Sequence, residues 1–168
     1  MPNFSKSLQV FSSNPSQAPK VPKWWLAGVL LFSFAGFLDS AYLTLQHYIG
    51  FKLVCSVVYG CEEVLGSSFA TLFGVPVALL GFLYYVALFL AAVAFIDRKK
   101  FVFLKFMVVV PIAGFFFTIW LVVIQAFILE AFCLYCLISA GLTTGLFFLS
   151  AYYLFYGYRK GIGSNRGI

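Results

Sequence analysis

Four long runs of apolar residues dominate the chain, and short polar segments separate them. The runs cover about 24–47, 70–96, 101–129 and 132–156. Each is long enough to cross a bilayer core of about 30 Å, which takes about 20 residues of helix. In lipid a helix satisfies its own backbone hydrogen bonds, and no alternating pattern typical of barrel strands is present. The pattern therefore predicts an all-α membrane protein, a bundle of four transmembrane helices.

The same pattern divides the 168 residues into three parts. Residues 1–23 are rich in Ser, Pro, Asn and Gln and are expected to form a disordered tail. Residues 24–158 form the membrane domain, and 159–168 a short second tail. The first apolar run is too long for the core of a secretory signal and has no small-residue cleavage pattern after it, so we expect it to remain as a membrane span.

Composition agrees with a membrane protein, because 63% of the residues are hydrophobic and only 10% are charged. Soluble chains carry about 25% charged residues. The net charge of +6 is no sign of nucleic-acid binding, since the basic residues lie between apolar runs and not along one face.

The basic residues predict the orientation of the bundle. Loops rich in Lys and Arg stay on the cytoplasmic side of a membrane. Of the 11 Lys and Arg residues, ten lie in the two tails, in the connection between the second and third runs or just inside the third run, and Lys52 lies on the opposite side. Both termini are thus expected in the cytoplasm, and the first loop (48–69) and the short third loop on the outer side. The residues of the cytoplasmic group are Lys6, Lys20, Lys23, Arg98, Lys99, Lys100, Lys105, Arg159, Lys160 and Arg166.

All four cysteines fall on the predicted outer side, in two pairs. Cys55 and Cys61 lie in the first loop, and Cys133 and Cys136 open the last run as Cys-Leu-Tyr-Cys. Such a distribution is typical of a protein that works in an oxidising compartment.

The Cys133/Cys136 pair has the spacing of a reactive dithiol. Residues three apart on a helix share one face, with Cβ atoms about 5–6 Å apart. The first helical turn also carries about half a positive charge, which favours the thiolate. On the first loop, Gly60 and Gly66 flank Cys61, so this pair could swing towards the other and exchange through a mixed disulfide.

Other interpretations remain open. Two structural disulfides could staple the outer loops of a scaffold or assembly protein without redox turnover. A four-thiolate zinc site is disfavoured by the irregular spacing and the oxidising compartment, so no metal is expected.

The ordered set of these residues resembles the vitamin K epoxide reductase family. The matching residues are Cys55, Cys61, Ser67, Cys133 and Cys136, together with Phe-Gly-Val-Pro at 73–76 and Asp-Ser-Ala-Tyr-Leu-Thr at 39–44. The resemblance covers about 30–139. The DsbB type of four-helix thiol oxidase fits less well, because it has its Cys-x-x-Cys in the first outer loop and its second pair in a long second outer loop.

The resemblance implies a membrane thiol-disulfide oxidoreductase that ends on a quinone, ubiquinone or menaquinone. Cys55 would exchange with a thioredoxin-like (DsbA-like) thiol oxidase, and Cys61 would pass electrons to Cys133. Cys136 would face the quinone and attack it, with a charge-transfer complex as one route. Disulfide formation in secreted proteins, at the outer face of a bacterial inner membrane, would follow.

Two departures from animal members of the family make epoxide reduction doubtful. Ala140 stands four residues after the last cysteine, where those proteins have a tyrosine, and Ala70 aligns with their asparagine before the second helix. The chain ends about ten residues past the last span, so its thioredoxin-like partner is expected to be a separate protein rather than a fused domain.

Three polar residues complete the predicted quinone site. Ser67 would hydrogen-bond near the quinone or orient the loop, or would simply cap the second helix. Asp39, an acidic residue deep inside a span, could relay protons to the reduced quinone, cap a neighbouring backbone group or pair with His47. Gln125 on the third run is expected to reach the quinone pocket.

Overall fold

The computed structural model describes residues 21–49, 70–72 and 74–164. This part of the chain contains four helices long and apolar enough to span a membrane: α2 (Lys23–Ile49), α4 (Val77–Arg98), α5 (Phe101–Phe127) and α6 (Leu134–Ser164, apolar to Phe155). The predicted fold class, a membrane bundle of four helices, is confirmed. The expectations for residues 1–20 and for most of the first outer loop lie outside the described residues.

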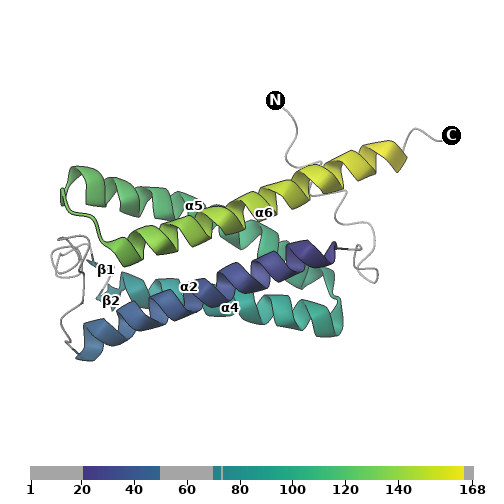
Figure 1. Cartoon of the computed structure of the whole chain (residues 1–168). Coiled ribbons are helices and arrows are strands. Elements are labelled where there is room, and N and C mark those ends of the chain that lie inside the picture. The colour runs from purple at the N-terminus through teal and green to yellow at the C-terminus, as the bar shows by residue number, and fades with distance from the viewer. Residues whose placement is uncertain (1–20, 50–69, 73, 165–168) are drawn as a thin grey trace.

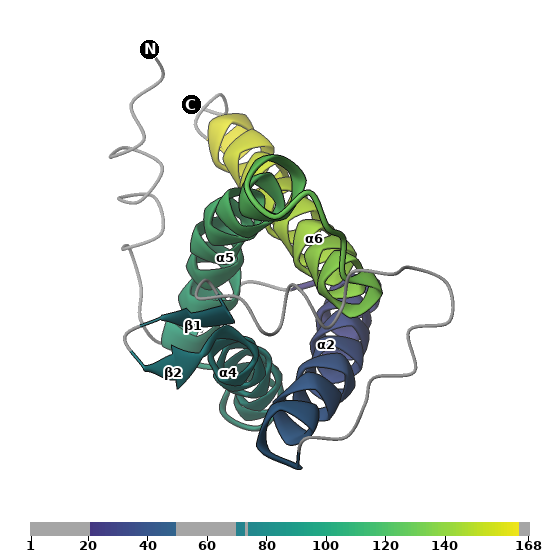
Figure 2. The same cartoon turned by 90° about the vertical axis from the view of Figure 1, so that its left-hand side faces the viewer.

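The helices form a closed ring around a common centre. α2 packs against α4 and α6, and α5 packs against the same two helices. Figure 2 looks down this ring from one end. In Figure 1 the start of α2, the α4–α5 turn and the end of α6 lie at one end of the bundle, and the short strands and the α5–α6 connection lie at the other. We call these the basic end and the cysteine end.

The outside of the ring is apolar and exposed, as expected of a surface that faces lipid. The relative solvent exposure is 72% for Leu31, 66% for Phe116 and 74% for Phe155. Exposure of so much apolar surface to water is unfavourable. A large exposed apolar surface therefore indicates contact with a membrane or with another protein. The arrangement fits a bundle that crosses a bilayer with helices of about the required length.

The second span begins at Val77, and the prediction that it begins near Ala70 is wrong. Residues Thr71–Leu72 (β1) and Val75–Pro76 (β2) instead form a small antiparallel hairpin, with Leu72 opposite Val75. Gly74 adopts a φ of 81°, which a glycine tolerates and other residues rarely adopt. Proline excludes the residue before it from helical geometry, so Val75 stays extended and Pro76 becomes the N-cap of α4.

The ends of the last two helices also differ from the predicted limits. α5 ends at Phe127, two residues before the predicted limit at Leu129, and a turn with Glu130 at a φ of 48° follows. α6 begins at Leu134 and not at Phe132, and it continues to Ser164, so six residues of the predicted second tail are helical.

Pro111 lies inside α5 and is buried. A proline has no N–H, so it leaves the carbonyl four residues earlier, that of Met107, without its helical donor. Ser150 of α6 offers a replacement, because its single hydroxyl proton is shared between the Met107 oxygen, at 3.2 Å from Oγ, and the Leu146 oxygen of its own helix, at 2.9 Å. The packing of α5 against α6 therefore satisfies a polar group that lipid would leave unpaired.

The main core fills the basic half of the bundle. Trp25, Leu88, Leu104, Met107 and Leu146 are completely buried there. Trp25 Nε1 also donates a 2.7 Å hydrogen bond to the Leu149 carbonyl, which fastens α2 to α6. Side chains thus pack the ring solidly towards the basic end, whereas its cysteine half encloses a cavity.

Candidate active site

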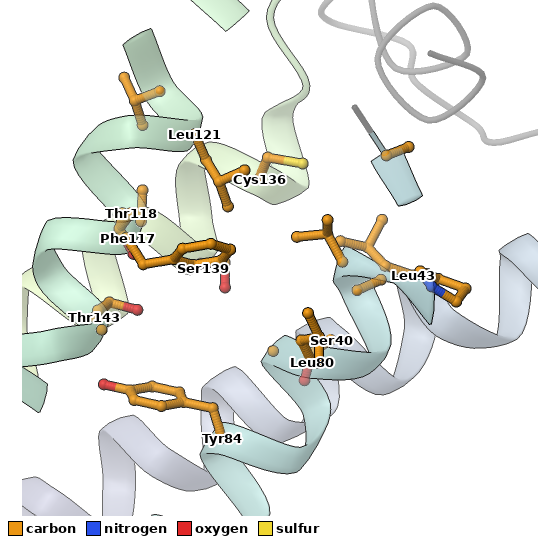
Figure 3. Close-up of a pocket in the computed structure, with 18 of the residues that line it drawn as sticks. Ser40, Leu43, Leu80, Tyr84, Phe117, Thr118, Leu121, Cys136, Ser139 and Thr143 are labelled. Carbon is orange, nitrogen blue, oxygen red and sulfur yellow. The ribbon is translucent and has the colours of Figure 1, made fainter. Parts of the chain in front are cut away.

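A cavity of about 210 Å³ lies between the four helices in the cysteine half. Its wall is largely apolar, with a few polar side chains from each helix (Figure 3). An apolar concave site with a small number of placed polar groups is the usual form of a small-molecule site. Its lining residues include Ser40, Leu43, Leu80, Tyr84, Tyr85, Gly114, Phe117, Thr118, Leu121, Gln125, Cys136, Ser139 and Thr143.

The two cysteines of the last span take different positions. Cys133 precedes the first residue of α6 and is completely buried, against Ala131. Cys136, in the first turn of α6, is half-buried and forms part of the cavity wall. Both are free thiols, and their sulfur atoms are within hydrogen-bonding contact. One thiol of the pair therefore faces the cavity and the other lies behind it.

The surroundings of Cys133 favour its thiolate. The hydrogen bond from the Cys136 thiol is the largest cause, and it lowers the pKa of Cys133 to about 7. Burial opposes this shift, while the backbone N–H groups of Tyr135 and Cys136 add to it. Backbone donors at a helix start stabilise negative charge in this way. The buried thiol is therefore suited to act as a nucleophile near neutral pH.

Gln125 connects both cysteines to α5. Its Oε1 accepts a 3.4 Å hydrogen bond from the Cys133 backbone N–H, and its side chain is also hydrogen-bonded to Cys136. The backbone carbonyl of Gln125 accepts a 3.3 Å hydrogen bond from the backbone N–H of Ala131. The residue lines the cavity, and it also holds the segment that precedes α6 in place.

Tyr85 fixes α4 to the face of α6 that carries Cys136. Its hydroxyl lies 2.9 Å from the Ser139 carbonyl, 3.0 Å from Ser139 Oγ and 2.8 Å from Thr143 Oγ1. Its ring occupies the space that a side chain on Gly36 would need, so the glycine allows α2 to approach. These three contacts of the Tyr85 hydroxyl hold α4 against α6 and thereby fix the position of Cys136 along the bundle axis relative to α4.

Asp39 lies close to the thiol pair but outside the cavity wall. It acts electrostatically on Cys133 and on Tyr85, and its Oδ2 is buried without a hydrogen-bond partner among the described residues. The predicted alternative of a pair with His47 is not seen, because the described ion pairs do not include one and the His47 ring packs on Tyr48.

Three predicted site residues, Cys55, Cys61 and Ser67, lie outside the described residues. Ala70 and Ala140, which replace polar residues of animal family members, both line the cavity. They contribute only methyl groups to its wall. Among the described residues, no cluster of His, Cys, Asp and Glu could hold a metal ion.

Sequence analysis missed the tyrosines and hydroxyls of this cavity. Tyr84 and Tyr85 of α4 and Ser139 and Thr143 of α6 are not among the predicted site residues, yet all four line the cavity. A signal was present, because Ser139 and Thr143 follow Cys136 at three and seven residues, the spacing of one helix face.

These features define a class: a membrane protein of four helices with a pair of cysteines at one end of an internal, largely apolar cavity. The family model described as the vitamin K epoxide reductase family matches residues 27–151. The chain belongs to that family. It is also similar to thiol-disulfide oxidoreductase LTO1 of Arabidopsis thaliana, with 35% identity over 122 residues, which are 67% of this chain and 32% of the relative.

The chain therefore spans about a third of the length of this curated relative. The family match and the four apolar helices together support the coarse prediction of a multi-pass membrane protein of the vitamin K epoxide reductase family.

Proposed function

We propose that the chain oxidises the thiols of a thioredoxin-like protein and transfers the electrons to a quinone in the membrane. The observation that carries this proposal is the position of Cys136, on the wall of an apolar cavity and in contact with the buried thiol of Cys133. A structural disulfide requires no cavity beside it. A dithiol that delivers electrons to an apolar acceptor requires both features.

The electron path has three exchanges. The dithiol of the partner reduces a Cys55–Cys61 disulfide, and the resulting thiols reduce a Cys133–Cys136 disulfide by thiolate attack through a mixed disulfide. When Cys133 and Cys136 join again, two electrons and two protons leave the pair. The first two exchanges each break one disulfide and form another, and in the third a quinone would take up the two electrons and two protons, so thiols and electrons balance.

The cavity fits the head group of a quinone. When bound, a quinone supplies the acceptor of two electrons and two protons that the dithiol needs. The volume of about 210 Å³ suits a small ring system, and the largely apolar wall matches a flat ring. A long isoprenoid tail, as in ubiquinone or menaquinone, would extend from the cavity between helices into the lipid.

The chain's own residues then have distinct tasks. Cys136 contacts the acceptor, and Cys133 closes the disulfide with a pKa that permits attack near neutral pH. Asp39, with an unpartnered oxygen near the pair, takes up and passes on a released proton. Ser67 of the first loop, which lies outside the described residues, would hydrogen-bond near the acceptor or orient that loop.

The position of Cys133 and Cys136, opposite to the basic end, supports a partner on the outer side of the membrane. By the positive-inside rule the basic end is cytoplasmic, so the thiol exchange occurs at the outer face. In a bacterial inner membrane this face meets the periplasm, where a DsbA-like oxidase introduces disulfides into secreted proteins. Reoxidation of such an oxidase is the proposed physiological role.

A coupled assay tests the proposal. The purified protein is mixed with a reduced thioredoxin-like oxidase and a short-chain quinone, and the loss of quinone absorbance is followed for the wild type and for Cys136→Ser. We expect turnover in the wild type and none in the variant. A folded wild-type protein that turns over no quinone and whose disulfides resist a mild reductant would instead support the scaffold alternative.

A further inference from the structure

Tyr84 of α4 lies at the end of the cavity that is farther from Cys136. Its ring lines the cavity, and Figure 3 places it across the cavity from Cys136. Its hydroxyl oxygen is buried and has no hydrogen-bond partner among the described residues. Such an orphaned group is unfavourable and calls for an explanation, of which a missing ligand is one.

The neighbouring tyrosine shows that the position is unusual. Tyr85, the next residue of α4, has its hydroxyl within 3.0 Å of three oxygen atoms of α6. The two rings meet edge to face, with centroids 5.0 Å apart. The hydroxyls of these two adjacent tyrosines therefore differ: the Tyr85 hydroxyl is fully engaged with protein, whereas the buried hydroxyl of the half-buried Tyr84 keeps its donor unused.

α5 provides a second hydroxyl at this end of the cavity. Gly114 leaves open the space beside Tyr84, because a Cβ there would lie 2.8 Å from the Tyr84 hydroxyl oxygen. Thr118, one turn further along α5, also lines the cavity. Thr44 and Thr144 each donate to the carbonyl four residues earlier in their helix, but Thr118 makes no such bond within the described residues.

The other end of the cavity offers a different set of groups. Cys136 and Gln125 lie there, and Gln125 is already bonded to the Cys133 N–H. Ala70 and Ala140 add no polar atom. The cavity thus has a thiol at one end, unengaged hydroxyls at the other and a largely apolar wall between them, in which the hydroxyl of Tyr85 is engaged with those of Ser139 and Thr143. This polarity matches a flat apolar ring with an oxygen on each of two opposite sides.

We propose that Tyr84 and Thr118 form a second polar subsite, which donates hydrogen bonds to the carbonyl oxygen of the quinone that lies farther from Cys136. The subsite rests on the proposed function and specifies its substrate class, a para-quinone that enters ring first. Its donors orient the ring so that the other side faces Cys136. They also withdraw electron density from the ring, which favours attack by a thiolate.

Binding of a short-chain para-quinone to Tyr84→Phe and Thr118→Val, with the full chain in lipid nanodiscs, tests the subsite. Removal of one donor should raise the dissociation constant about three- to tenfold, the usual effect of losing one hydrogen bond. The carbonyl stretching frequency of the bound quinone, measured by infrared difference spectroscopy, should rise. Tyr153→Phe, a buried tyrosine of the basic half outside the cavity, is the matched control and should leave both readouts unchanged.

The unliganded Tyr84→Phe protein should melt no lower than the wild type, because the hydroxyl it loses has no partner. Wild-type affinity and carbonyl frequency in both variants would overturn the subsite while leaving the proposed function intact. A wild-type protein that neither binds nor reduces a quinone would overturn both. If Tyr84→Phe does not fold, Thr118→Val alone decides between these outcomes.

Discussion

The side-chain oxygen of Gln125 accepts a hydrogen bond from the backbone N–H of Cys133, at 3.4 Å. This contact spans the turn between α5 and α6 and fixes the residue from which α6 starts. The same amide contacts Cys136, so one side chain positions both thiols. The geometry of the dithiol therefore depends on a residue of another helix as well as on its own Cys-x-x-Cys segment.

Replacement of Gln125 by Met should impair the dithiol more than it impairs the fold. Met has similar length but cannot accept the Cys133 N–H, so the free energy of unfolding should fall by about 1 kcal/mol. The rate of disulfide formation between Cys133 and Cys136 should fall more, because the two sulfurs lose their fixed relation. Thermal unfolding and stopped-flow thiol oxidation measure the two effects. Equal oxidation rates would show that Gln125 only lines the cavity.

The reactivity of Cys133 should depend on the thiol of Cys136. With Cys55 and Cys61 replaced by Ala, the pH dependence of Cys133 alkylation should have a midpoint of about 7. Because the Cys136 hydrogen bond is the largest cause of this low pKa, Cys136→Ala should move the midpoint upwards. Cys136→Ser keeps a donor and should keep the midpoint low. Identical profiles for Ala and Ser would assign the effect to the helix start alone.

Ser150 should stabilise the bundle only because Pro111 is present. Ser150→Ala leaves the Met107 carbonyl unpaired and should cost about 1 kcal/mol, within the range known for hydrogen bonds between membrane helices. In a Pro111→Ala background, the restored N–H can bond to Met107, so the same change should cost less. Thr144→Ala, which loses a bond within its own helix, is the control. A double-mutant cycle without coupling would contradict this account.

Gly114→Ala should disturb the cavity without weakening α5. The added methyl would meet the Tyr84 ring at 2.8 Å, so the ring must move. We expect quinone affinity to fall at least threefold by loss of a fixed hydrogen bond. Gly141→Ala, with no atom within 4 Å of its new methyl, is the matched control on α6 and should not change affinity. An unchanged affinity for Gly114→Ala would indicate that the ligand does not reach Tyr84.

The sequence predicts the number of spans and their approximate limits, because hydropathy acts over whole segments. The hairpin before α4 was missed, since it depends on the backbone of Gly74 and Pro76 within an apolar run. The contacts of Tyr84, Tyr85 and Ser150 were missed as well. They depend on how each helix is rotated in the ring, and apolar spans with polar residues on several faces do not reveal that rotation.

The most direct test of the account is an anaerobic single turnover. A variant with Ala at Cys55 and Cys61 is reduced, separated from reductant and mixed with one equivalent of a short-chain quinone, and free thiols are counted by alkylation and mass spectrometry. The account predicts that the two remaining thiols disappear together for each quinone reduced, with a disulfide between Cys133 and Cys136. Bound quinone with both thiols still free would contradict it.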